Sequence, residues 1–216
     1  MLKNLNYNQK NSNKILTTFL EKRKSIQKSQ TSAVKRIIQN VKKNGDKAVL
    51  SYEKKFSKIK IKSNKILFSS KEINKLSRKT DKKLKKAIDL AFNRIKSFHL
   101  KQKFSSFRFK DKYKNELSYK YSSIEKIGVY VPGGTASYPS TVLMNCIPAL
   151  VAGVKNIYLA TPSLDSKINP AIIYAAKKCG VKKIYRTGGA HTIAALAYGT
   201  KNFEKVDKIV GPGNTY

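Results

Sequence analysis

The chain has 216 residues, 40% of them hydrophobic, which is enough to bury a core in one large domain or two small ones. No stretch approaches the ~18 consecutive apolar residues of a membrane span, and the opening MLKNLNYNQKNSNKILTTFLEK is too polar for a secretory signal. The composition therefore excludes a membrane-spanning protein and favours a cytoplasmic one.

The charge is strongly basic, with 46 Lys and Arg against 12 Asp and Glu and a formal net charge of +34. Such a field attracts polyanions, so a nucleic-acid-binding protein is one hypothesis. Residues 1–124 carry 35 of the 46 basic residues, nearly all Lys, among many Asn and Ile. All three residue types have A/T-rich codons, so genomic base composition explains the excess without a ligand. The sequence also lacks zinc-finger spacing and RNA-binding aromatic motifs.

Two cysteines, Cys146 and Cys179, lie in apolar stretches without the spacing of metal ligands. This pattern predicts two buried, reduced thiols in a reducing cytosol.

Residues 1–30 are polar with scattered apolar positions, which predicts a mobile arm or a short helix. A first helical face follows from Ser32, and Gly45 is expected to end that helix. Asp46 is expected to cap a second helix. The apolar positions of the two helices are Val34, Ile37, Ile38 and Val41, then Val49, Tyr52 and Phe56.

Two further helices are expected downstream. Ser69 and Glu72 have the spacing of a capping box, and a long amphipathic helix follows Asp81. Between Phe104 and Ile124, aromatic residues and Lys alternate roughly, which predicts one or two exposed strands or a hairpin.

After Ile124 the sequence repeats an apolar run, a turn of small residues and an amphipathic segment. The runs start 30, 27 and 25 residues apart, which fits the strand, helix and return of βαβ units in a parallel sheet. Pro170 suits the first turn of one helix and Gly180 its end, and AHTIAALAYG predicts a helix that ends at Gly199. The four runs are Ile127 to Val131, Ile157 to Ala160, Ile184 to Tyr185, and Ile209 to Val210.

We therefore expect an α/β protein in which an N-terminal helical layer precedes an incomplete Rossmann-like parallel sheet with flanking helices. Residues 31–124 would be the mainly helical part of a first, incomplete α/β domain, and residues 125–216 a truncated Rossmann-like domain. Open parallel sheets bind ligands beyond the carboxyl ends of their strands. Those ends here read YVPGGTASYPST, ATPS, RTGGAHT and VGPGNT.

Three of these four turns are rich in glycine, so a ligand could approach the backbone and the next helix could offer free N–H groups to a phosphate. The sequence has no G-x-G-x-x-G and no P-loop, and glycine is also common in such turns for steric reasons. Both interpretations stay open.

Three side chains at these turns are candidate ligand contacts, each with a structural alternative. Tyr130 could stack on a ring or be a half-buried strand aromatic. Asn214 could donate to a ribose or phosphate, or simply cap a helix. His191 follows GGA at a helix start, where it could contact a ligand or serve in capping and packing.

The segments IGVYVPGGTASYPSTVLMNCIPALVAGVKNI, YRTGGAHTIAALAYGT and KVDKIVGPGNTY together resemble the histidinol dehydrogenase family, in order and in separation. The resemblance continues more weakly through VKKNGDKAVLSYEKKF and AFNRIKSFHLKQ, so it covers Val34 to the last residue. It implies oxidation of L-histidinol to L-histidine through the aldehyde, in histidine biosynthesis. It also implies two NAD molecules used in turn, substrate held on zinc, and a homodimer of multi-domain subunits in the cytoplasm.

By this resemblance, Tyr130, His191 and Asn214 match positions that contact NAD. His191 departs from the family, which usually has Gln in GGAQ, and an imidazole offers hydrogen bonds with a different reach from an amide. NELSYKYSSIEKIG also lacks the Gly that the family usually has shortly before the strand.

The resemblance further implies truncation, because GPGN lies near the middle of family members. Their zinc ligands and the Glu-His pair for acid–base chemistry lie in the part that is absent, so we assign no catalytic residue and no metal ligand and expect this chain to be inactive alone. Two alternatives stay open. One is a stand-alone NAD-binding module without catalysis, and the other is a basic nucleic-acid binder, whose affinity would fall steeply with salt.

Overall fold

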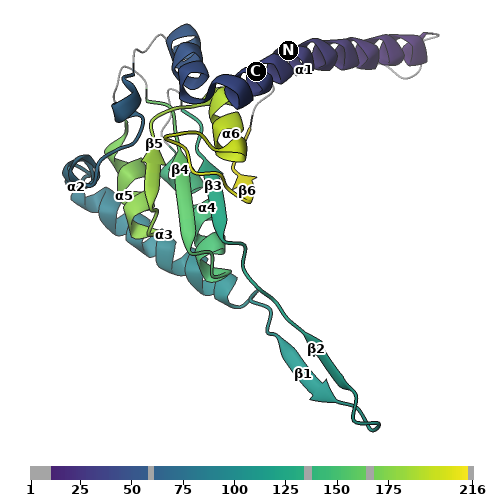
Figure 1. The fold of residues 1–216 in the computed structure, drawn as a ribbon, viewed down its shortest axis with the longest axis vertical. Coiled ribbons are helices and arrows are strands. Elements are labelled where there is room, and N and C mark those ends of the chain that lie inside the picture. The colour runs from purple at the N-terminus through teal and green to yellow at the C-terminus, as the bar shows by residue number, and fades with distance from the viewer. Residues whose placement is uncertain (1–10, 58–60, 134–137, 164–167, 214–216) are drawn as a thin grey trace.

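The computed structural model describes residues 11–57, 61–133, 138–163 and 168–213. Helices cover both faces of a parallel sheet, and two elements, a long helix and a hairpin, project from the body in Figure 1. No helix within these described ranges is long and apolar enough to cross a membrane.

The N-terminal helix α1 spans Ser12–Tyr52 and continues into the π-helical turn η1, Glu53–Ser57. It begins inside the segment expected to be an arm or short helix. Gly45, at φ 52° and ψ −131°, breaks its helical geometry, which confirms the predicted end of a first helix there. The carboxylate of Asp46, expected to be a helix cap, instead accepts hydrogen bonds from Thr200 Oγ1 and Asn202 Nδ2. It thereby ties α1 to the loop after helix α6 (Gly189–Tyr198).

A short 3₁₀ turn, η2 (Ser63–Lys65), leads to α2 (Ser70–Arg78) and α3 (Lys82–Leu100). The capping box is confirmed, because Glu72 N–H donates to Ser69 Oγ and Ser69 N–H donates to the Glu72 carboxylate. Asp81 caps α3 by accepting from the N–H groups of Lys83 and Leu84.

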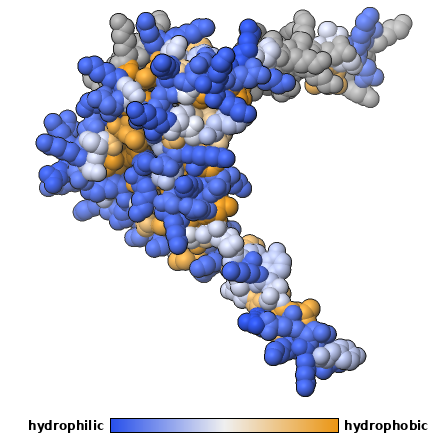
Figure 2. All heavy atoms as spheres, in the orientation of Figure 1, coloured by the Kyte–Doolittle hydropathy of each residue, from blue (hydrophilic) through white to orange (hydrophobic). Residues whose placement is uncertain are grey.

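Strands β1 (Phe107–Lys110) and β2 (Glu116–Tyr119) form the predicted hairpin and pair antiparallel. Figure 1 shows this hairpin extending away from the body. All eight strand residues are exposed, and Phe107 stacks on Tyr119 across the strands. In Figure 2 white and orange side chains lie along the hairpin, with blue ones toward its tip, and blue side chains cover most of the visible body.

The main sheet is parallel, with strand order β5-β4-β3-β6, and confirms the four apolar runs as strands. Helix α4 connects β3 to β4, helix α5 connects β4 to β5, and helix α6 leads from β5 to β6. Pro170 begins α5, and α6 ends before Gly199, as expected. The bounds are β3 Lys126–Tyr130, α4 Pro139–Val151, β4 Asn156–Ala160, α5 Pro170–Lys178, β5 Lys183–Tyr185, α6 Gly189–Tyr198 and β6 Lys208–Val210.

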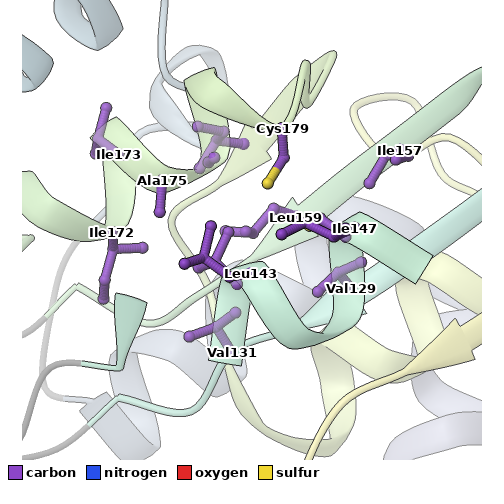
Figure 3. Close-up of a cluster of buried hydrophobic side chains, with 14 of the residues drawn as sticks. Val129, Val131, Leu143, Ile147, Ile157, Leu159, Ile172, Ile173, Ala175 and Cys179 are labelled. Atoms are coloured by element: carbon purple, nitrogen blue, oxygen red, sulfur yellow. The ribbon is translucent and has the colours of Figure 1, made fainter. Parts of the chain in front are cut away.

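Each face of the sheet has its own hydrophobic core. On one face α4 and α5 pack on the strands, as Figure 3 shows for Leu143 and Ile147 near Val129 and Leu159, with α2 and α3 outside them. On the other face α6 packs on the sheet and α1 packs on α6. Both cores draw residues from before and after position 124, so the helical layer and the sheet share them.

Cys146 of α4 and Cys179, directly after α5, are buried in the first of these cores and are free thiols. The prediction of two buried, reduced cysteines is therefore confirmed.

Candidate functional site

The connection between β5 and β6 creates a switch point in the sheet. From β3 the chain adds β4 and β5 to one side, and then returns through α6 to place β6 on the other side of β3. Helix α4, which follows β3, packs on one face of the sheet, and α6, which leads to β6, packs on the other. Such a reversal of strand order is where open α/β sheets bind ligands.

A crevice of about 650 Å³ opens at this point. Its volume lies within the range of pockets that hold small molecules and cofactors. Its walls come from α1, from the carboxyl ends of β3 and β6 with the turns that follow them, and from α6. They include Ile38 of α1, Tyr130 and Gly133, Ile193 and Tyr198 of α6, and Gly211.

Tyr130 joins two walls of this crevice. Its phenol oxygen accepts a hydrogen bond from the backbone N–H of Gly189, the first residue of α6, over 3.2 Å. Gly211, at φ 136°, lies so close that a Cβ there would overlap with the carbonyl oxygen of Tyr130. The ends of β3 and β6 can therefore approach each other only because position 211 is glycine.

The glycines of the other turns allow three loops to pack together. A Cβ on Gly133 would overlap with the ring of Pro162, and a Cβ on Gly188 would come within 2.8 Å of the same ring. These two glycines thus serve loop packing, in line with the steric interpretation of the glycine-rich turns. Gly189 has φ 70° and lines the crevice.

Behind the turn that opens α6, the structure buries a carboxylate and an imidazole. Glu53, at the start of η1, is 1% exposed and His191 of α6 is 2% exposed. Glu53 Oε1 lies 2.9 Å from His191 Nε2 and accepts the Gly188 N–H over 2.8 Å. The rings of Tyr52 and Phe56 lie beside the imidazole, with centroids 5.7 and 6.1 Å from it.

Burial raises the pKa of the Glu53 carboxyl, but hydrogen bonds from His191, Gly188 and Ser57 lower it more, so it ends below its ordinary value. The carboxylate is therefore ionised at neutral pH and can only accept hydrogen bonds. His191 Nε2 must then carry the proton that it shares with Glu53. Its Nδ1 is buried and has no hydrogen-bond partner in the described structure.

The described residues include two of the three that were predicted to contact a ligand, and the structure separates these two. Tyr130 lines the crevice. His191 is buried behind the turn with its ring toward η1, and it is not among the described residues that line the crevice. Asn214 lies outside the described residues, although the preceding Gly213 lines the crevice.

Sequence reasoning missed Glu53. Its signal was present in the spacing, because Val49, Glu53 and Phe56 recur at helical intervals and so place a carboxylate on an apolar helix face. A charge on such a face needs a buried partner.

Within the described residues, no three His, Cys, Asp or Glu side chains gather closely enough to hold a metal ion. The crevice itself is lined by apolar, tyrosine, glycine and proline residues. These residues offer no zinc ligands.

Comparison with known proteins shows what this architecture belongs to. The family model described as histidinol dehydrogenase matches residues 20–216. The chain is 53% identical over 216 residues to the histidinol dehydrogenase of Pelagibacter ubique (strain HTCC1062). The match covers all of this chain and 50% of that relative. The chain belongs to the histidinol dehydrogenase family.

Other histidinol dehydrogenases match a similar proportion of this chain. The enzyme of Bacillus subtilis (strain 168) is 47% identical over 188 residues, which are 87% of this chain and 44% of that protein. The crystal structure of histidinol dehydrogenase from Elizabethkingia anophelis superposes with a TM-score of 0.81 at 41% identity, over 86% of this chain and 43% of that one. The chain therefore spans about half the length of the family members that it matches, and it shares their α/β fold.

Proposed function

We propose that this chain is the dinucleotide-binding part of a histidinol dehydrogenase, which oxidises L-histidinol to L-histidine in two NAD-dependent steps. The observation that supports it most is the crevice between the carboxyl ends of β3 and β6. It lies at the switch point of a parallel sheet, and Tyr130 lines it. The first two residues of α6, Gly189 and Ala190, also line it, so the N-terminal turn of that helix borders the site.

Each wall of the crevice would serve one part of the dinucleotide. The ring of Tyr130 offers an aromatic surface for a planar base. Gly213, where a Cβ would meet no atom within 4 Å, lets a ligand approach the backbone after β6. From the resemblance we propose that Asn214 adds an amide contact. The formal net charge of +34 favours the approach of an anionic ligand.

The remaining chemistry of the family would be supplied from outside these residues. Removal of a hydride from an alcohol needs a base for the hydroxyl proton, and zinc would polarise that oxygen. The described residues do not form a zinc site, so we assign no step of the oxidation to them. Binding of L-histidinol, zinc and a second subunit is proposed for the whole protein only.

Isothermal titration of the 216-residue chain with NAD tests the proposal. We expect saturable binding at one site per chain, weakened at least about tenfold by Tyr130→Ala, because a buried aromatic contact and its hydrogen bond are lost. Tyr113→Ala is the matched control, since Tyr113 lies at the exposed tip of the hairpin, away from the crevice. Equal affinity of the wild type and Tyr130→Ala would show that NAD, if bound, does not use this crevice.

A further inference from the structure

In the turn that begins α6, both polar backbone groups of Gly188 form hydrogen bonds with side chains. The Gly188 N–H donates to Glu53 Oε1 over 2.8 Å, and the Gly188 carbonyl accepts from Thr192 Oγ1, also over 2.8 Å. The next residue, Gly189, lines the crevice and donates its own N–H to Tyr130. The position of this turn is therefore set from behind by Glu53 and from the crevice side by Tyr130.

Glu53 reaches the turn from a distant part of the chain. It lies 135 residues before Gly188, at the start of η1, and its carboxylate is almost completely buried. An ionised carboxylate in such a place is stable only if donors surround it, and removal of one donor leaves an uncompensated charge. Gly188 supplies one donor and His191 another.

His191 completes this arrangement from the first turn of α6. Its Nε2–H donates to the same oxygen of Glu53, and its ring fills the space between Glu53, Tyr52 and Phe56. A Cβ on Gly189 would lie 3.1 Å from His191 Cε1, so the imidazole packs directly beneath the residue that lines the crevice. The negative charge of Glu53 also faces the positive end of the α6 dipole.

We infer that Glu53 and His191 form a buried positioning pair that fixes the Gly188–Gly189 turn at the edge of the crevice. This assigns to the His191 side chain a role behind the turn in place of the direct NAD contact that the family resemblance implies. If the proposed function is right, the pair sets NAD affinity without touching NAD, because a displaced turn also displaces the Tyr130 hydroxyl and the start of α6.

The pair makes a prediction that simple packing does not. His191→Gln keeps an N–H donor for Glu53, whereas His191→Leu keeps apolar volume against Tyr52 and Phe56 but has no donor. If the pair positions the turn, the Gln variant should behave like the wild type, and in the Leu variant the Gly188–Gly189 turn should move from its wild-type position. A packing role requires the reverse.

The test uses ¹⁵N-labelled 216-residue chain and two readouts. The first, without NAD, is the amide resonance of Gly188, which we expect to move upfield in Glu53→Leu, which has no acceptor, and in His191→Leu, and to stay within the wild-type range in His191→Gln. The second is NAD affinity by titration, which we expect to weaken about tenfold in Glu53→Leu and His191→Leu, because a charge-assisted hydrogen bond is lost behind the turn, and to change less than about threefold in His191→Gln. Asp89→Leu is the matched control, since it removes a carboxylate that joins α3 to α5 on the opposite face of the sheet.

The outcomes separate the pair from the proposed function. An unchanged Gly188 resonance in Glu53→Leu, or wild-type behaviour of His191→Leu with loss in His191→Gln, would overturn the pair. If the wild-type chain binds no NAD, the proposed function fails, while the Gly188 resonance still decides whether Glu53 and His191 hold the turn.

Discussion

The phenol oxygen of Tyr130 accepts the backbone N–H of Gly189 over 3.2 Å, and this bond joins the end of β3 to the first residue of α6. The two residues are 59 positions apart in the chain. The bond closes one corner of the crevice, and Gly211 closes the next, where β6 ends against the Tyr130 carbonyl. The shape of the proposed binding site therefore depends on Tyr130 through both its side chain and its backbone.

Removal of the Tyr130 hydroxyl should weaken NAD binding without unfolding the protein. Tyr130→Phe keeps the ring but leaves the Gly189 N–H without this acceptor, and a hydrogen bond of about 1 kcal/mol corresponds to a loss of about fivefold in affinity. Titration calorimetry measures the effect. Tyr174→Phe is the control, because its hydroxyl bonds to Asp89 on the other face of the sheet. An affinity equal to that of the wild type would show that the Tyr130 to Gly189 bond does not shape the site.

A methyl group at position 211 should be poorly tolerated. Gly211→Ala would place a Cβ against the Tyr130 carbonyl oxygen and would also strain a backbone at φ 136°. We expect a loss of about 3 kcal/mol in the free energy of unfolding, from overpacking and backbone strain together. Gly213→Ala is the control, because a Cβ there meets no atom within 4 Å. Denaturant unfolding of both variants gives the difference, and equal stabilities would mean that β3 and β6 do not end against each other.

The capping-box carboxylate Glu72 should make stability depend on pH in acid. Burial raises the pKa of this group, but hydrogen bonds from Ser69 and Arg186 and the charge of Arg186 lower it more, to about 2 from its ordinary 4.5. The folded pKa lies below the unfolded one, so the stabilisation is present above about pH 4.5 and is lost as the pH falls toward about 2.

Thermal melts at about pH 5 and about pH 3 check this dependence. The wild-type melting temperature should fall more over this interval than that of Glu72→Gln, which has no carboxylate to protonate. Glu125→Gln, at an exposed position, should keep the wild-type dependence. Parallel curves for the wild type and Glu72→Gln would contradict the assigned role of Glu72.

Salt should distinguish a dinucleotide site from a nucleic-acid surface. Binding of NAD in the crevice involves few phosphates, so its affinity should change by less than about tenfold between 50 and 200 mM salt, whereas 6 to 10 phosphate contacts would cost about 10³ to 10⁵. Titrations of NAD and of a single-stranded oligonucleotide at both salt concentrations make the comparison. Tight, steeply salt-dependent oligonucleotide binding that survives Tyr130→Ala would support the nucleic-acid alternative.

Local signals in the sequence predicted most of the secondary structure. The apolar runs at βαβ intervals became the four strands of the parallel sheet, and Ser69 with Glu72 formed the expected capping box. Gly45 broke the first helix as expected. These features depend on neighbouring residues or on the period of the chain, both of which a single sequence displays.

Long-range partners could not be predicted in the same way. Asp46 was expected to cap its own helix, yet it bonds to Thr200 and Asn202, more than 150 residues later. The partner of His191 is Glu53, which lies 138 residues earlier. No local pattern specifies such pairs, because they form only when α1 packs on α6.

The central claim is that NAD binds in the crevice between β3 and β6, and mapping of amide resonances in the ¹⁵N-labelled chain during an NAD titration tests it most directly. We predict that the largest shifts occur at Tyr130, Gly189 and Gly211, with little change in the hairpin at Phe107 to Tyr119. Shifts centred on the hairpin or on the Lys-rich surface of α3, or no shifts at saturating NAD, would contradict the claim.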